Sequence, residues 1–183
     1  MCSSDLPAIA TLLPSRWVYI GTLSKTLSPG LRVAYVVCAT PGDAARIAAG
    51  LRSIALTPAP IMAAAATTWI REGRADALLA AVRAEARARR ALAAALLPAA
   101  EGAAESLHVW LPLPAEASAD HIRAAAQARG LALVTQEAFQ IGPAAEPGMR
   151  ISLGGPERRA VLADALGRLA ETLAGPVGPR PVV

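Results

Sequence analysis

Two short apolar runs near the start of the chain limit what it can fold into. The segments "RWVYIGTL" and "RVAYVVCA" are rich in β-branched and aromatic residues, which is typical of buried β-strands. We expect the first strand from about Trp17 to Gly21. The second run is almost continuously apolar, which suits a sheet covered on both faces. No crossover precedes this pair, so we interpret it as the end of an α/β sheet whose beginning is missing.

Helical patterns come after the two strands. Thr40 is suited to cap a helix in "TPGDAARIAAGLRS", with Pro41 in its first turn. The segment "LTPAP" predicts a break, and "IMAAAATTWIREG" predicts a helix that ends near Gly73. From Arg74 to Leu97 the spacing predicts one long amphipathic helix with its arginines and acids on the solvent face.

The rest of the chain alternates strand and helix. Strands are predicted for "SLHVWLPL", "LALV" and "GMRISLGG". A helix in "SADHIRAAAQARG" has Ser118 as its cap and Gly130 as its stop, and a closing helix is expected from Pro156 to Gly175. Two tryptophans, Trp69 and Trp110, are interpreted as core residues.

This order predicts α/β architecture in two subdomains joined by the long helix. The expected segments are the end of a larger α/β domain (1–73), the linking helix (74–98), a small α+β domain (99–175) and a flexible tail (176–183). The first six residues fit poorly with the segment that begins at Pro7. Because "CSSDL" resembles the translation of a common sequencing adapter, we interpret residues 1–6 as not native.

Composition argues against several classes of function. The formal net charge is +4, but arginines alternate with acids as in "RAEARARR", so we expect no direct nucleic-acid binding by this chain. Cys2 and Cys38 form no disulfide framework or zinc pattern, and His108 and His121 lack a metal-site spacing. No apolar run approaches the roughly 18 residues of a membrane span. We therefore place the protein in a reducing cytoplasm, without a metal and away from membranes.

Lys25 in "GTLSKTLSPGLR" is the only lysine in a chain that has 17 arginines. A lysine amine can lose its proton and form a Schiff base with an aldehyde, whereas arginine stays charged and is a poor nucleophile. The residue type alone leaves a solvated loop lysine as an equal alternative. Hydroxyls on Thr22 and Ser24 precede it, and Pro29 and Gly30 predict a turn after it.

That turn can fold Arg32 back toward the hydroxyls. Hydroxyls, backbone N–H groups and an arginine fork are what a phosphate dianion requires. The segment thus offers an amine for an aldehyde beside a seat for a phosphate. Pyridoxal phosphate (PLP) carries both groups.

"YIGTLSKTLSPGLRVAYVV" resembles the lysine signature of the fold-type I, class I/II aminotransferases, with Ala34 in place of the usual glycine. The resemblance implies a partial PLP-dependent transferase type I fold. It also implies that Lys25 is the catalytic lysine that forms the internal aldimine, and that Thr22, Ser24 and Arg32 hold the cofactor phosphate.

A second arginine of the family grips the substrate α-carboxylate from a strand of the small domain, and "GMRISLGGPERR" resembles that element. The resemblance implies this role for Arg150, whose alternative is a strand-edge arginine in a surface salt bridge. By analogy alone, Glu137 and Phe139 lie where the family shapes its substrate entrance.

The C-terminal part, with "HVWLPLP", "ARGLALVTQEAF" and "MRISLGGP", most resembles the aminotransferase-like domain of GntR/MocR-type transcriptional regulators. Three functions stay open: amino-group transfer between an amino acid and a 2-oxo acid, sensing of PLP or an amino effector beside a missing winged helix-turn-helix, and an inactive fragment. The resemblance runs from about Pro7 to Gly175 and places the aspartate for the pyridine nitrogen further upstream, so Asp5 is not assigned that role. We expect little transaminase activity from this fragment alone, and a homodimer for the full-length protein.

Overall fold

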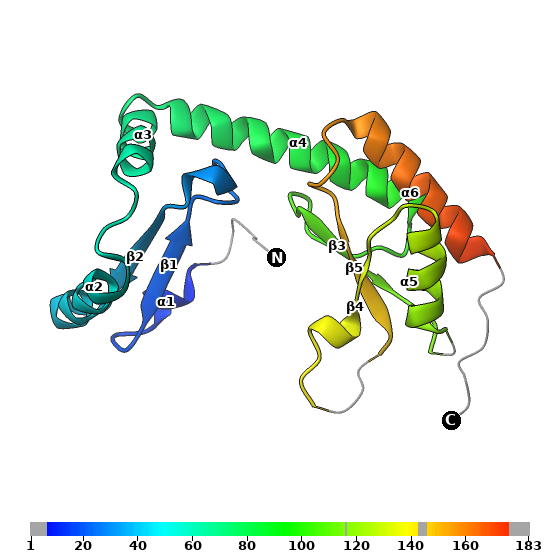
Figure 1. The fold of residues 1–183 in the computed structure, drawn as a ribbon, viewed down its shortest axis with the longest axis horizontal. Coiled ribbons are helices and arrows are strands. Elements are labelled where there is room, and N and C mark those ends of the chain that lie inside the picture. Colours follow the sequence, from blue (N-terminus) through cyan, green and yellow to red (C-terminus); the bar gives the residue numbers. More distant parts are fainter. Residues whose placement is uncertain (1–6, 116, 143–145, 176–183) are drawn as a thin grey trace. The chain divides into compact units, whose positions relative to one another are not determined.

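The computed structural model describes residues 7–115, 117–142 and 146–175 (Figure 1). The chain divides into two compact units between Arg83 and Ala84, inside the long helix α4 (Arg74–Leu96). The predicted limits of the linking helix and the small domain stay a prediction. The predicted leader (1–6), with Asp5, and the predicted tail (176–183) lie outside the described residues.

The unit that ends at Arg83 is built on a β-hairpin followed by helices. Its strands β1 (Val18–Thr22) and β2 (Ala34–Cys38) pair antiparallel, with Val18 opposite Cys38 and Thr22 opposite Ala34. Both predicted strands are confirmed. The other elements are α1 (Ile9–Leu12), the 3-10 helix η1 (Pro29–Leu31), α2 (Pro41–Ala55), α3 (Pro60–Arg71) and the first turns of α4.

Local capping explains where α2 begins. The hydroxyl of Thr40 accepts a hydrogen bond from the backbone N–H of Asp43 at 3.1 Å, and Pro41 occupies the first turn. The break predicted for "LTPAP" is confirmed between α2 and α3. Gly73, whose φ is +71°, follows α3 as expected.

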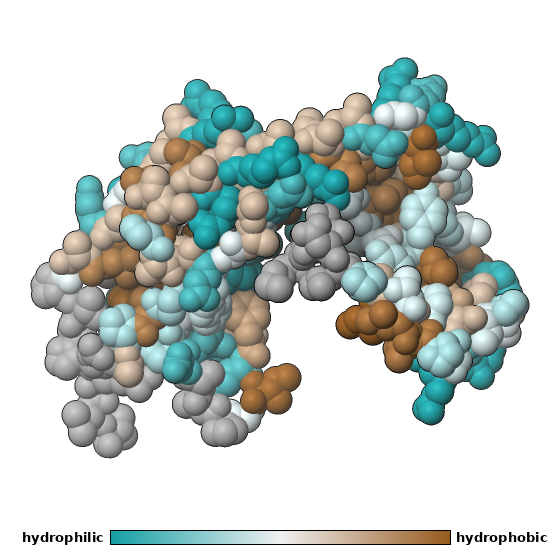
Figure 2. All heavy atoms as spheres, turned by 180° about the vertical axis from the view of Figure 1, so that it is seen from behind, coloured by the Kyte–Doolittle hydropathy of each residue, from teal (hydrophilic) through white to brown (hydrophobic). Residues whose placement is uncertain are grey.

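The expectation that both faces of this sheet are covered is wrong for the described chain. Tyr19, Ile20 and Val37 are half or more exposed, and brown hydrophobic residues lie at the molecular surface in Figure 2. The reason is geometric: α2 contacts β2, but one helix cannot cover two faces of a hairpin. The buried apolar residues of this unit, among those described, are Leu31, Val33 and Ala66.

The unit that begins at Ala84 contains a three-stranded antiparallel sheet in the order β3–β5–β4. Its ranges after α4 are β3 (His108–Pro112), α5 (Ala119–Ala128), β4 (Val134–Thr135), the 3-10 helix η2 (Gln136–Ala138), β5 (Gly148–Ser152) and α6 (Arg159–Ala174). Ser118 caps α5 by accepting from the N–H of His121, as predicted. Strand β4 is shorter than "LALV" and begins only at its last residue.

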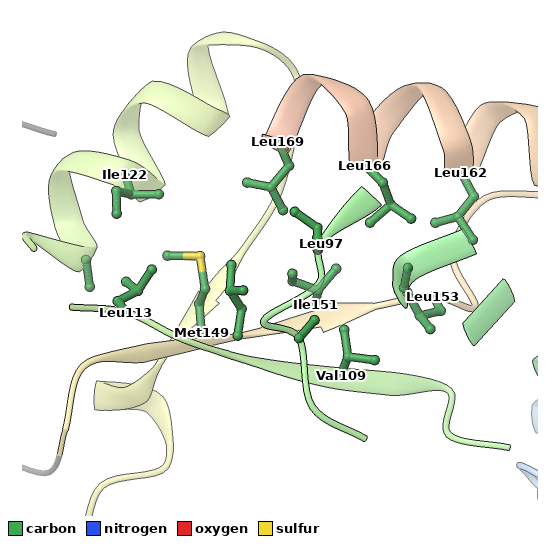
Figure 3. Close-up of a cluster of buried hydrophobic side chains, with 14 of the residues drawn as sticks. Leu97, Val109, Leu113, Ile122, Met149, Ile151, Leu153, Leu162, Leu166 and Leu169 are labelled. Carbon is green, nitrogen blue, oxygen red and sulfur yellow. The ribbon is translucent and has the colours of Figure 1, made fainter. Parts of the chain in front are cut away.

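A single hydrophobic core lies between this sheet and the helices on one of its faces (Figure 3). Met149, Ile151 and Leu153 point into it from β5 and the residue that follows, and Ile122 comes from α5. Helix α6 contributes apolar residues at the i, i+4, i+7 spacing of one helical face: Leu162, Leu166 and Leu169.

Arg89 corrects two sequence-based expectations. It lies on α4 but is only 7% exposed, rather than on the solvent face. Its guanidinium donates to the backbone carbonyls of Leu153 at 2.9 Å, Pro156 at 2.6 Å and Glu157 at 3.2 Å. Helix α6 begins at Arg159 rather than at Pro156, and the carbonyls of Pro156 and Glu157 just before it accept hydrogen bonds from Arg89.

Glu85 completes this attachment of α4 to α6. It accepts hydrogen bonds from Arg89 at 2.7 Å and from Arg159 at 2.6 Å. The bond from Arg159, and then the bond from Arg89, lower the pKa of Glu85 to about 2. Burial alone would raise this pKa. The same pair raises the pKa of Arg159. The carboxylate therefore stays charged through the ordinary pH range.

Within the described part of the chain, no helix combines the length and the apolar character that crossing a membrane requires.

Candidate cofactor-binding and carboxylate-binding residues

The β1–β2 hairpin carries the lysine loop, defined as residues 23–33, at one of its ends. Where the strands end, the N–H of Leu23 donates to the carbonyl of Val33 at 3.1 Å, which closes the loop. A turn over residues 23–27 is held by the N–H of Leu27, which donates to the carbonyl of Leu23 at 2.9 Å. Buried Leu31 and Val33 anchor the second half of the loop, whereas Lys25 is exposed.

The two hydroxyls predicted beside the lysine lie together. Thr22 Oγ1 is 3.0 Å from Ser24 Oγ, to which it donates, and it accepts from the backbone N–H of Ser24 at 3.2 Å. This local turn places both oxygens just before Lys25. The predicted role of these two hydroxyls toward a phosphate stays a prediction.

Arg32 leaves the same loop from an unusual backbone conformation. It follows η1, which Ser28 caps by accepting from the N–H of Gly30 at 3.2 Å. The φ of Arg32 is +50°, in the left-handed region, and its side chain is exposed. Neither Lys25 nor Arg32 forms an ion pair with any carboxylate that the structure describes. Two cations and two hydroxyls thus share one loop end.

Arg150 lies in the other unit, on the central strand of its sheet. Its backbone is opposite Trp110 on one side and Val134 on the other. Since Met149 and Ile151 point into the core, the alternation of a strand puts Arg150 on the opposite face. No described acid pairs with it, and its guanidinium carbon lies 4.9 Å from the centre of the Phe139 ring. Arg150 therefore differs from the alternative interpretation, an arginine on an edge strand that forms a surface salt bridge.

Sequence reasoning missed the neighbours that surround Arg150. Trp110 was expected in the core, but it lies half-buried on the Arg150 face, and Trp69 is also only half-buried. The alternation in "HVWLP" could have predicted this position of Trp110. Val109 and Leu111 are the core residues of that strand, so the residue between them faces the other side of the sheet. Among the described residues no cluster of Cys, His, Asp or Glu is suited to hold a metal ion.

Known proteins resemble this chain in fold. Its structure superposes on the kynurenine aminotransferase of Pyrococcus horikoshii, solved in complex with PMP, with a TM-score of 0.77 and 22% identity over 86% of this chain. The chain has part of the aminotransferase fold. A multiple substrate aminotransferase of Thermococcus profundus (TM-score 0.76, 24% identity, 87% of this chain) and the α-aminoadipate aminotransferase of Thermus thermophilus (0.70, 23%, 86%) match in the same way.

A comparison of sequences matches a different kind of protein. The chain is 28% identical over 158 residues to an uncharacterised HTH-type transcriptional regulator of Bacillus subtilis, and this covers 84% of the chain. The chain spans about a third (34%) of that regulator, and 40%, 41% and 42% of the three aminotransferases. No family model matches the sequence.

Proposed function

We propose that this chain is part of a PLP-dependent aminotransferase-like domain, which in the whole protein transfers an amino group between an amino acid and a 2-oxo acid. The observation that carries this proposal is the lysine loop. The only lysine of the sequence stands exposed in a hairpin loop, directly after two paired hydroxyls, and the same loop carries Arg32, which pairs with no described acid. The fold likeness to aminotransferases supports it.

The donor set of the lysine loop fits this cofactor. A phosphate dianion accepts hydrogen bonds and prefers a cation. The loop offers the hydroxyl of Ser24 and the guanidinium of Arg32, and Thr22 at the end of β1 adds a second hydroxyl. Lys25 adds a primary amine beside them. When bound, PLP supplies an aldehyde and a ring that accepts electrons. Residues of this chain would hold the cofactor at both its phosphate and its aldehyde end.

Each residue then has a distinct task. Lys25 Nζ would hold the cofactor through its aldehyde, and its amine would be the base that accepts the proton of the substrate α-carbon. Arg150 binds the substrate α-carboxylate with its two parallel N–H groups, which orients that α-carbon. We expect little transaminase activity from these 183 residues alone, since no described residue is assigned to the pyridine nitrogen of the cofactor. Activity measured with the isolated chain would contradict this expectation.

A second candidate function is favoured by one observation, the sequence likeness to an HTH-type transcriptional regulator. In this case the same residues bind PLP or an amino compound as an effector, and a winged helix-turn-helix elsewhere in the whole protein binds DNA. The coding sequence upstream of this chain separates the two: a winged helix-turn-helix there supports the regulator, and its absence the enzyme. The expected homodimer of the full-length protein, which light scattering tests, serves either function.

The lysine is tested with PLP and the whole 183-residue chain. We expect an absorbance band near the visible edge, and borohydride reduction should attach the cofactor to the peptide that contains Lys25. The chain offers one other primary amine, at its N-terminus, so mass mapping is decisive. Lys25→Arg keeps the charge without the reactive amine and should show no band.

Pyridoxal, which lacks the phosphate, is the matched control ligand. It should require a much higher concentration than PLP, and Arg32→Leu should reduce this preference. Equal labelling by PLP and pyridoxal, or labelling that persists in Lys25→Arg, would overturn the proposed cofactor site.

A further inference from the structure

Three side chains form a stack on the Arg150 face of the sheet. Trp110 from β3 meets the Phe139 ring edge-on, with ring centres 6.4 Å apart and planes at 73°. The face of Phe139 in turn carries the guanidinium carbon of Arg150 at 4.9 Å from the ring centre. Both contacts have the geometry that the ring quadrupole favours. We call these three residues the Arg150 stack.

Gly148 makes the position of Trp110 possible. A Cβ atom at residue 148 would lie 2.4 to 2.7 Å from three atoms of the Trp110 indole, which is closer than real contacts allow. The indole therefore lies directly on the backbone of β5. The requirement for glycine comes from this close approach and not from the backbone, since Gly148 has no left-handed φ.

Gln136 fixes the position of Phe139. Its side chain is buried, and its Oε1 accepts from the backbone N–H of Gly148 at 3.1 Å, which ties η2 to β5. Its Nε2 donates to Glu137 at 2.7 Å. Phe139 follows η2 at once and its N–H donates to the carbonyl of Gln136 at 2.8 Å. Gln136 is thus hydrogen-bonded both to the backbone of Phe139 and to the strand that carries Arg150.

Arg150 differs from other arginines of its unit in what it contacts. Arg123, Arg129 and Arg168 each pair with a nearby acid, whereas the Arg150 partner that the structure describes is an aromatic face. A ring occupies the face of a guanidinium and leaves its in-plane N–H groups for a ligand. A planar carboxylate binds to those groups in that plane.

We propose that Phe139 is a positioning residue for Arg150. Its ring holds the guanidinium flat, so that the N–H fork is ready for a carboxylate before the ligand arrives. Gly148 and Gln136 keep the ring in place. This inference rests on the proposed function in one respect, that Arg150 binds a carboxylate. Phe139 itself contacts the arginine and is not assigned a contact with the ligand.

The experiment is a titration of the 183-residue chain with propionate, followed by nuclear magnetic resonance, with propionamide as the uncharged control. The indole N–H signal of Trp110 reports binding in every variant. The Arg150 side-chain protons should be shifted upfield by the Phe139 ring current. Phe139→Leu should remove this shift and weaken propionate binding roughly two- to fivefold, whereas Phe139→Tyr should retain both.

Ile141→Ala is the matched control, because Ile141 lies in the same segment and is 99% exposed. It should change neither affinity nor the ring-current shift. Methyl signals of Met149 and Leu166 show that the core is intact in each variant, so a change in affinity is not a loss of folding. Leucine at position 139 keeps an apolar side chain but has no ring, whereas tyrosine keeps the ring. Wild-type binding in Phe139→Tyr but not in Phe139→Leu therefore shows that the ring positions Arg150.

Arg150→Lys distinguishes the two possible failures. If it binds propionate as the wild type does, the carboxylate role of Arg150 is wrong, and the positioning role fails with it. If Arg150→Lys loses binding but Phe139→Leu keeps the wild-type affinity, only the positioning role of Phe139 is overturned. The PLP adduct at Lys25 depends on neither result.

Discussion

The two units bury similar sequence patterns very differently. In β3, "HVWLP", Val109 and Leu111 are buried in the core, whereas in β1, "VYIGT", Val18, Tyr19 and Ile20 are all exposed. Both are short strands rich in β-branched and aromatic residues. The difference lies in the helices that cover them: α5 and α6 complete a core over one sheet, and the hairpin lacks such a cover among the described residues.

The comparison matters for the candidate sites. Arg150 is mounted on a central strand whose neighbouring residues are fully buried, so its register is strongly specified. The lysine loop depends on a hairpin that buries mainly Leu31 and Val33. The residue proposed to bind a carboxylate therefore stands on a well-packed support, and the loop proposed to bind the cofactor on a much weaker one.

The largest expected difference between the units comes from removing one apolar side chain in each. Leu166, 2% exposed, lies in the core, and Leu166→Ala should lower the free energy of unfolding by about 2–5 kcal/mol. Ile54, 87% exposed on α2, is the matched position, and Ile54→Ala should change it by less than about 0.5 kcal/mol. Urea unfolding followed by circular dichroism measures both. Equal losses of unfolding free energy would contradict the stated difference in burial between the two units.

A glycine-to-alanine substitution in each unit should change stability in opposite directions. Gly148→Ala places a Cβ against the Trp110 indole and should destabilise the sheet by about 1–3 kcal/mol. Gly50→Ala, in α2, meets no atom within 4 Å and should instead stabilise its helix by roughly 0.5–1 kcal/mol. Calorimetric unfolding of the two variants measures whether each substitution lowers or raises the stability. A neutral Gly148→Ala would mean that the indole is free to move away.

The smallest effect concerns pH and the attachment of α4 to α6. Because the pKa of Glu85 is about 2 in the folded unit, against an ordinary value of 4.5, its ion pairs stabilise the unit above the ordinary pKa. This stabilisation is lost as the pH falls from about 4.5 through 2. Wild type should thus unfold at a higher temperature than Glu85→Gln at pH 7, and the difference should vanish near pH 2.

Glu171→Gln is the control for this prediction, because Glu171 also pairs with an arginine but is 67% exposed. Its effect at pH 7 should be smaller, since exposed pairs contribute little. A Glu85→Gln difference that stays constant from pH 7 to pH 2 would show that the substitution acts through packing rather than charge.

Features set by neighbouring residues were predictable from the sequence. The caps at Thr40 and Ser118 depend on a hydroxyl three residues before an N–H. Their partners are within one turn of chain. The sequence alone therefore predicted where α2 and α5 begin.

Features set by distant residues were not predictable. The segment just before α6 binds Arg89, whose carbonyl partners lie 64 to 68 residues further along the chain. The exposure of β1 depends on which elements cover it. Phe139 contacts Arg150, and Gln136 binds Gly148, across intervals of 11 and 12 residues, and a local pattern of residue types does not predict such contacts.

The left-handed backbone of Arg32 has a consequence for how this chain can evolve. A residue with a Cβ loses about 1 kcal/mol there relative to an unstrained conformation, and glycine would not. Glycine at position 32 would thus favour a more stable hairpin but would remove the guanidinium. If Arg32 binds the cofactor phosphate as proposed, selection for stability and selection for anion binding act in opposite directions on this one residue.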